Sequence, residues 1–398
     1  MSRGGRRILW ALLAGGTVLR LVFAFSFYGV DFDMDSLVLV ADLLADRPLD
    51  VYAQANLTEI ARWPYPPGFF PFVLGADAVA RETGLPFHGL VQLPPILADA
   101  GIAWLVQDFL RHRGASERDR LLSAGLVALG PAMFLVSGYH GQIDSVAILP
   151  AVAAVWVWEC RPDWRGRALA AGLLIGLGAS VKTVPLVVVF ALLPWCKGPR
   201  EAITLVVAAA VVPLAALAPW LAADADATVD ALRYTGAPGV AGLGLLVQPN
   251  LIEFWLGGQP ILLSGGSEWL LDHGTTIATV LLAVTALVVA RRRLEPAQAA
   301  SVLWLAVYVL GVNFFFQYLV WGIPFFLMAG HRRAVVALQA VALPAAVLLY
   351  LAPWEHYLRA AVVYVPLAMG LWVAFGVALL RSRRWARPPH GGARAAAP

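Results

Sequence analysis

Charged residues and cysteine are both scarce in this chain. Only 14% of its 398 residues are charged, 60% are hydrophobic, and the mean hydropathy is +0.74. No long polar stretch could form a separate soluble domain. A water-soluble protein of this length could not bury so much apolar surface. The composition therefore predicts an integral membrane protein with a single domain, residues 1–398.

Metal-ligand spacings and phosphate-binding glycine loops are missing as well. The 7 histidines are scattered, and no Gly-rich loop of the P-loop or dinucleotide type occurs, so the sequence predicts neither a metal site nor a nucleotide-binding loop. We expect no cofactor and no bound metal, although an acidic loop leaves assistance by a divalent cation open. The two cysteines, Cys160 and Cys196, stand beside basic segments predicted to be cytosolic, so we expect free thiols.

Hydrophobic runs predict the fold class. A helical span needs about 20 apolar residues, and the chain holds about twelve runs near that length. This indicates an all-α polytopic membrane protein. The N-terminal run resembles a signal peptide but has no small-residue cleavage site, so an uncleaved anchor is expected. The predicted spans are 8–28, 88–110, 121–138, 143–159, 168–181, 182–196, 201–221, 275–290, 297–313, 316–330, 334–352 and 361–380.

Basic residues orient these spans, because cytoplasmic loops are enriched in Lys and Arg. With the N-terminus inside, most of the 29 Lys and Arg fall in inner loops and in a cytosolic tail, 381–398. The sequence pI of 9.2 then reflects topology rather than nucleic-acid binding. We expect a plasma-membrane protein with both termini in the cytoplasm and two long outer loops, 29–87 and 222–274.

The first outer loop contains an apolar segment, 69–80, that is too short to cross the membrane. We interpret it and the segment 36–45 as two helices on the outer surface. The sequence Trp63-Pro64-Tyr65-Pro66-Pro67-Gly68 joins them. Its double proline predicts a sharp extended turn that cannot continue a helix.

Three carboxylates, Asp31, Asp33 and Asp35, follow the first span. Carboxylates are costly where a membrane meets water, so they indicate a functional site by default; a solvated acidic loop is the alternative. In an extended segment Asp33 and Asp35 would share one face. Either can take a proton from a sugar hydroxyl at the mouth of a lipid-facing cavity.

A break near Lys182 divides the apolar stretch 168–195 into two short predicted helices. It would leave Lys182 within the membrane, facing a cavity rather than lipid. A lysine that extends to the interface is the alternative. Deeper in the membrane, Asp99 of the second span is a candidate structural partner for Arg20 of the first.

The remaining candidates fall on the same predicted side of the membrane. They offer cations for a phosphate, and amide, hydroxyl and aromatic groups for a sugar. The alternative for several is an ordinary polar turn or loop residue. The predicted substrate-binding residues are Asp31, Tyr65, His140, Gln142, Asp144, Lys182, Arg233, Gln317 and Tyr318, and Asn313 belongs to the same group.

These motifs, in this order, resemble the GT-C superfamily of glycosyltransferases that use polyprenyl-phosphate sugars. They are similar to the endoplasmic-reticulum glucosyltransferases of dolichol-linked oligosaccharide assembly and to the first GPI mannosyltransferase. The resemblance implies a catalytic Asp in the first outer loop, two surface helices around it and a lipid-phosphate donor that enters sideways. It rests on Asp31 to Asp35, Tyr65-Pro66-Pro67, His140 to Ser145, Lys182 to Pro185, Arg233-Tyr234, Gln248-Pro249-Asn250 and Gln317 to Trp321.

The expected function is inverting transfer of a hexose, with mannose favoured, from a polyprenyl-phosphate sugar to a lipid-linked or glycolipid acceptor. Asp33 would be the base, with Asp35 ranked close behind it, and the site would lie on the extracytoplasmic side. Membrane lipids are the other expected partners. A secondary transporter or flippase of a lipid-linked sugar is the alternative, although no convincing internal repeat supports it. A subunit that only binds such a lipid is a third possibility.

Overall fold

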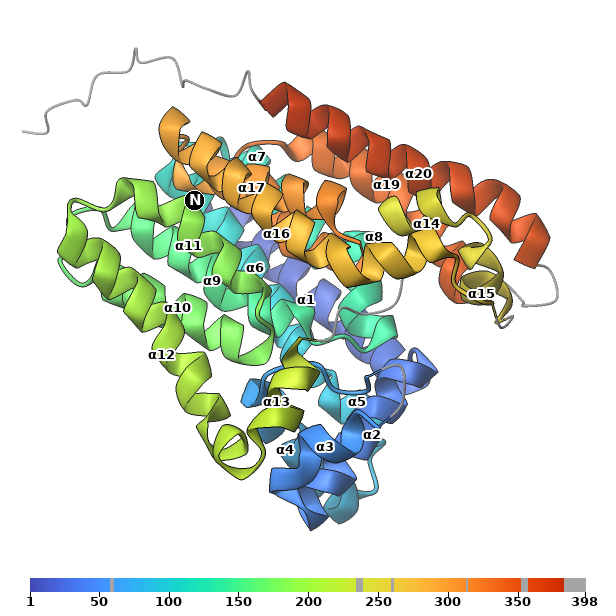
Figure 1. Ribbon diagram of the computed structural model, residues 1–398. Helices are drawn as coiled ribbons and strands as arrows, with labels where there is room; N and C mark the ends of the chain where they lie inside the picture. The colour runs from blue at the N-terminus through green and yellow to red at the C-terminus, as the bar shows by residue number, and fades with distance from the viewer. Residues whose placement is uncertain (58–60, 234–238, 259–260, 313, 352–356, 383–398) are drawn as a thin grey trace, which may run out of the picture.

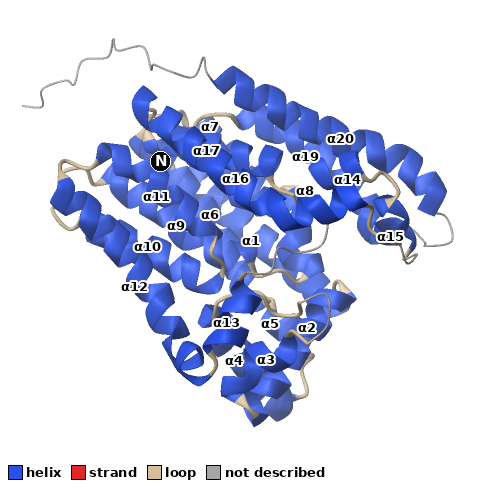
Figure 2. Cartoon of the chain, in the orientation of Figure 1, coloured by secondary structure: helices blue, strands red, loops and turns tan. Residues whose placement is uncertain are grey.

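Helices account for nearly all the regular structure in the computed structural model (Figure 2). Among the described residues, extended pairing is limited to one bridge between Ala241 and Phe314. The structure describes all residues except 58–60, 234–238, 259–260, 313, 352–356 and 383–398, so the predictions that concern Asn313, Tyr234 and most of the C-terminal tail lie outside the described residues.

Within the ranges that the structure describes, seven helical segments are long and apolar enough to cross a membrane, by length and composition. They contain α1 (Arg3–Ser26), α5 (Phe87–Val91) with α6 (Leu93–His112), α7 (Glu117–Ala128) with α8 (Pro131–Leu135) and η3 (Val136–His140), α12 (Pro199–Ala223), α16 (Gly265–Arg292), α19 (Arg332–Leu351) and α20 (Tyr357–Arg381). An all-α protein with several membrane-spanning helices is therefore confirmed.

The other predicted spans coincide with shorter helices, so the number of about twelve crossings stays a prediction. Helices α10 and α17 have 15 residues each, which is about 22 Å at 1.5 Å per residue and less than a hydrocarbon core. The short helices are α9 (Asp144–Cys160), α10 (Arg167–Val181), η4 (Val184–Leu186), α11 (Val187–Leu192), η5 (Leu193–Trp195), α17 (Pro296–Leu310), η6 (Phe316–Tyr318) and α18 (Leu319–Met328).

The basic loops gather at one end of the molecule. Arg113 forms ion pairs with Glu159 and with Glu295, the latter at 2.6 Å, and so joins three loops that are far apart in sequence. Arg332 pairs with Asp119 in the same way. These contacts agree with a topology that places these loops on the same side of the membrane. That this side is the cytoplasm stays a prediction.

The opposite end is built mainly from residues 29–87, the segment predicted to be the first outer loop. Figure 1 shows the short helices that follow α1 and α12 packed together there, far from the N-terminus. Their apolar faces form a small core that includes Met34, Trp63 and Phe70, all at most 3% exposed. The elements at this end are α2 (Asp31–Asp46), η1 (Pro48–Asp50), α3 (Val51–Ala55), η2 (Pro67–Phe69), α4 (Phe70–Thr83) and α13 (Ala225–Leu232); α14 (Leu243–Val247) and α15 (Leu251–Gly257) lie nearer α20.

Both predicted helices of the first loop exist, but one begins earlier than expected. Helix α2 starts at Asp31 rather than at Ser36, so the acidic segment is helical. Helix α4 has 14 residues and follows the predicted proline turn. A side chain at Gly68 would come within 2.5 Å of Ser180, so only a glycine lets this turn pack against the end of α10.

Candidate active site

Asp33 and Asp35 point in different directions from the first turns of α2. Successive residues of a helix are separated by 100°, so these two side chains lie roughly 200° apart. The expectation that they share a face, which required an extended segment, is therefore wrong. Asp33 turns toward the interior and its side chain is 24% exposed. Asp35 and Asp31 both lie on the exposed side of α2.

Two side chains from one turn hold the Asp33 carboxylate. His140 places Nε2 at 2.6 Å from Asp33 Oδ2, and Gln142 donates from Nε2 to Asp33 Oδ1 at 2.7 Å. His140 and Gln142 are only 4% exposed, so both partners are fixed by packing. A carboxylate with both oxygens engaged has a defined orientation, which general-base catalysis requires.

The turn that carries these side chains has an unusual backbone. Residues Val136–His140 form a single π-helical turn, η3, and Gly141 follows with φ +90°. Single π turns occur frequently at functional sites, and a positive φ favours glycine. The His140 carbonyl accepts a hydrogen bond from the Val30 N–H at 3.2 Å, directly before α2. The backbone thus ties the turn to the helix that carries Asp33.

Tyr350 of α19 completes this group. Its hydroxyl lies 2.7 Å from His140 Nδ1. In a neutral imidazole one ring nitrogen donates and the other accepts, so a hydroxyl that donates to Nδ1 leaves the proton on Nε2, where Asp33 accepts it. The sequence analysis missed Tyr350, because nothing in its local sequence indicates that it meets a residue 210 positions away.

Asp35 has a separate partner on the surface. The Tyr28 hydroxyl donates to Asp35 Oδ1 at 2.7 Å. Partial burial and the hydrogen bond to Asp35 raise the pKa of Tyr28 to about 12, so the phenol stays a donor at neutral pH. Of the two predicted bases, Asp33 is therefore the one that joins the buried residues.

A second group surrounds Lys182, at the break between α10 and η4 that the sequence predicted. Its ammonium donates to Asp144 Oδ1 at 2.8 Å, and Trp321 Nε1 donates to the same oxygen. The ammonium also lies 4.6 Å from the centroid of the Tyr65 ring. Lys182 is 5% exposed. Its charge is therefore compensated by a carboxylate and by aromatic faces.

Aromatic rings and a carboxylate oxygen make this second group suitable for a sugar. Tyr318 stacks on Trp321 with ring centroids 3.9 Å apart. Among the described residues, Asp144 Oδ2 is buried and has no hydrogen-bond partner. Buried carboxylate oxygens without a partner are rare in proteins and call for a ligand or a water molecule. Gln317 is half-buried in η6, beside this stack.

A small pocket lies beside Asp33, and Tyr65, which also contacts Lys182, is part of its lining. The pocket contains an arginine that was not predicted from the sequence. Arg62 donates to the Phe32 carbonyl at 3.1 Å, and its guanidinium carbon lies 4.3 Å from the centroid of the Phe32 ring. The signal was present, since Arg62 immediately precedes the Trp63-Pro64-Tyr65 segment. The pocket is lined by Asp33, Ser36, Leu37, Arg62, Trp63, Tyr65, Gly141, Gln142 and Ile143.

Arg233 is not brought into either group among the described residues. It caps the C-terminal end of α13 and is exposed. No set of three His, Cys, Asp or Glu side chains in the described ranges is placed to hold a metal ion. Cys160 and Cys196 are both free thiols.

Comparison with known families adds an independent finding. A family model described as glycosyltransferase family 87 matches residues 63–316, which is more than half of the chain. The matched range includes Tyr65, the turn at His140 and Lys182, whereas Asp33 lies before it and Tyr350 after it. None of the curated proteins matches the sequence.

Proposed function

The chain belongs to glycosyltransferase family 87, and we propose that it transfers a hexose, with mannose favoured, from a polyprenyl-phosphate sugar to a lipid-linked or glycolipid acceptor. The single observation that carries this proposal is the Asp33 carboxylate, held by His140 and Gln142 at a pocket that also contains Arg62. A membrane transferase needs a base and a cation within reach of one reacting centre, and this pocket offers both.

In the proposed reaction Asp33 takes the proton from the acceptor hydroxyl. The hydroxyl oxygen forms a bond to C1 of the sugar while the bond between C1 and the phosphate oxygen breaks. The polyprenyl phosphate leaves with the bonding electron pair, and the configuration at C1 is inverted. The proton on Asp33 then passes to water. His140, with its proton on Nε2, keeps the carboxylate oriented throughout.

The leaving phosphate needs positive charge, and charge-assisted hydrogen bonds supply it most effectively. Arg62 lines the pocket with Asp33, and we assign to it the main contact with the phosphate. Lys182 was predicted for this role, but its ammonium is engaged by Asp144. We therefore propose that Lys182 acts mainly by holding Asp144 and Tyr65. Arg233 is exposed at the end of α13, so in this proposal a contact between Arg233 and the donor phosphate requires a movement of the loop 222–274 toward the pocket.

The group around Lys182 is proposed to bind the sugar. Asp144 Oδ2 is the acceptor for one sugar hydroxyl, and the amides of Gln142 and Gln317 serve others. The stacked Tyr318 and Trp321 offer an aromatic face to the ring. Tyr65 lies between this group and Asp33, since it contacts Lys182 and lines the pocket.

The short helices suggest how the polyprenyl-phosphate donor would enter the site. Helices α10 and α17 are too short for a full hydrocarbon core. Lys182 directly follows α10, and Tyr308 near the end of α17 donates to the Tyr318 carbonyl at 2.9 Å. A polyprenyl chain can then remain in the bilayer while its phosphate enters sideways. We place this site on the extracytoplasmic side of a plasma membrane, with both termini in the cytoplasm, because of the basic loops at the opposite end.

The test is sugar transfer by the purified protein in detergent. A short-chain polyprenyl-phosphate mannose is offered with extracted membrane lipids, and glucose and arabinose donors run in parallel. Label in a lipid product that disappears in Asp33→Asn but persists in Asp35→Asn supports the proposal. Equal transfer by wild type and Asp33→Asn contradicts the assigned base. No transfer with any donor, together with movement of a lipid-linked sugar across vesicles, would favour the flippase.

A further inference from the structure

One buried carboxylate, that of Asp99, accepts hydrogen bonds from both ends of a turn. This turn carries three residues of the candidate active site. We propose that Asp99, held by Arg20, is a positioning residue for the segment 138–144. The inference rests on the proposed function, because this segment contains His140, Gln142 and Asp144. Asp99 itself lies in α6, inside the protein, and contacts none of the reacting groups.

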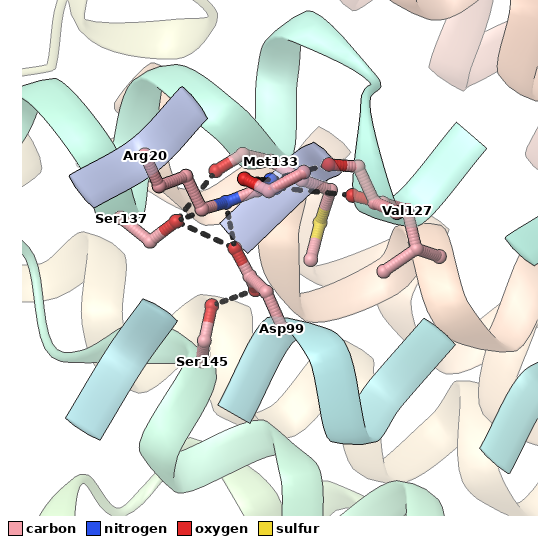
Figure 3. Close-up of polar contacts among 8 residues, drawn as sticks. Arg20, Asp99, Val127, Met133, Ser137 and Ser145 are labelled. Carbon is pink, nitrogen blue, oxygen red and sulfur yellow. Dashed lines mark hydrogen bonds and ion pairs between the residues drawn. The ribbon is translucent and has the colours of Figure 1, made fainter. Parts of the chain in front are cut away.

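The two oxygens of Asp99 bind opposite ends of the segment. Ser137 donates to Oδ2 at 2.5 Å, and Ser145 donates to Oδ1 at 2.5 Å. Figure 3 shows both serines turned toward the same carboxylate, from the elements on either side of the turn. A single rigid group therefore sets the separation between the start of η3 and the first turn of α9.

Arg20 of α1 fixes Asp99 in turn. Its Nε donates to Asp99 Oδ2 at 3.0 Å and to Ser137 Oγ at 2.9 Å (Figure 3). Its other nitrogens donate to the backbone carbonyls of Gly16, Val127 and Ala128. A guanidinium with all of these contacts has one orientation, so the carboxylate has one as well.

The burial of this pair argues for a role beyond stability. Arg20 and Asp99 side chains are each 1% exposed. Removing two charges from water costs several kcal/mol per ion, and apolar residues of similar volume often hold helices together as well or better. Ionisable groups inside a membrane are retained mainly where their position matters. Here Arg20 and Asp99 determine the position of the segment 138–144.

The path to the reacting centre is short. Asp99 holds Ser137 and Ser145, these bound the turn, and the turn presents His140 and Gln142 to Asp33. A shift at either serine therefore moves the two partners of the base together. The turn packs closely against Arg20, because a Cβ atom added at Gly138 would lie 3.0 Å from Arg20 Cγ.

The serine hydroxyls offer a test that spares the ion pair. Ser145→Ala and Ser137→Ala each remove one fastening, whereas Asp99→Asn would leave Arg20 uncompensated and endanger folding. The matched control is Ser301→Ala, since Ser301 is fully buried and its hydroxyl donates to the Ala297 carbonyl of its own helix at 2.8 Å. We expect kcat to fall about tenfold in the two test variants, because small displacements of positioned groups are costly. KM for the donor and the thermal midpoint should stay at the values of the control.

A coupling experiment separates positioning from a general loss of stability. In a Gln142→Ala background, Ser145→Ala should lower kcat by much less than it does in the wild type, because one of the side chains that it positions is already gone. If the two losses multiply, or if KM rises while kcat is unchanged, the proposal is overturned. A loss of activity that follows a lower thermal midpoint overturns it as well.

Hydrogen exchange followed by mass spectrometry tests the fastening without any substrate. Peptides that span residues 134–146 should exchange faster in Ser137→Ala and Ser145→Ala than in Ser301→Ala, with the rest of the protein unchanged. Unchanged exchange in this segment overturns the proposal. If the wild type transfers none of the sugars offered, the proposed function fails, and this measurement still decides whether Asp99 fastens the turn.

Discussion

His140 Nε2 lies 2.6 Å from Asp33 Oδ2 across 107 residues of sequence. This contact joins the helix after the first membrane span to a π-helical turn at the end of the third apolar segment. It distinguishes Asp33 from its neighbours in the same acidic motif, because Asp35 binds a surface tyrosine instead. The consequences for catalysis and stability can be measured directly.

Replacing Asp33 should abolish most of the transfer. Asp33→Asn keeps the shape of the side chain but removes the base, so kcat should fall about 10²- to 10⁴-fold, the usual contribution of general acid–base catalysis. Asp35→Asn is the matched control, two residues away on the exposed side of α2, and should retain near wild-type kcat. Initial rates at saturating donor measure both. A larger loss in the Asp35 variant would reverse the assignment.

Tyr350→Phe should lower kcat without a change in fold. The variant keeps the ring and removes only the hydroxyl that meets His140 Nδ1. One hydrogen bond is worth about 1 kcal/mol, which corresponds to a loss of about fivefold. Tyr364→Phe is the control, because it removes a buried hydroxyl that donates to the Val240 carbonyl, away from His140. Equal activity of the two variants would show that Tyr350 does not orient the histidine.

Arg62→Ala should weaken the use of the donor. If the guanidinium contacts the lipid phosphate, kcat/KM should fall about 10- to 100-fold, because hydrogen bonds to charged groups are worth about 1.5–3 kcal/mol. Arg62→Lys should recover only part of the loss, since an ammonium lacks the planar fork. Arg81→Ala is the control, because Arg81 is 60% exposed and pairs with Asp77 on α4. Donor titrations in detergent measure the effect.

The pair formed by Lys182 and Asp144 should matter for stability. Lys182→Met leaves a buried carboxylate without its cation, which costs about 3–5 kcal/mol of folding free energy. The double variant Lys182→Met with Asp144→Leu should regain most of that stability and still fail to transfer sugar. Thermal midpoints from intrinsic fluorescence measure the first effect. A single variant as stable as the wild type would contradict it.

Chelation should leave transfer unchanged. In the proposed reaction Arg62 stabilises the leaving phosphate and Lys182 holds the sugar group, so no step uses a divalent cation. Rates are compared after treatment with EDTA and after addition of Mg²⁺ or Mn²⁺ to the treated protein. Loss of activity that is restored by one of these ions would show that a metal assists the leaving group.

Much of the fold could be predicted because a helix that crosses a membrane requires a long run of apolar residues, which is visible in the sequence. Apolar runs marked the helices, and the break at Lys182 and the turn at Pro66-Pro67 were found where proline stops a helix. The sequence did not predict which of the Asp side chains in the acidic segment would face the protein interior. Its alternation of Asp with apolar residues suits an extended strand, and the structure continues it into helix α2, where packing of Met34 and Leu37 decides the phase.

The sequence by itself determined the class of protein and the segments of chemical interest, because hydrophobicity, charge and proline act locally along the chain. Tertiary structure alone decided which of the two carboxylates, Asp33 or Asp35, contacts the buried side chains of the candidate site. It also paired Lys182 with Asp144, and brought Arg62 and Tyr350 to the site and Asp99 beneath it. The physical reason is that these relationships depend on helix rotation and on contacts between residues far apart in sequence, which no local pattern records.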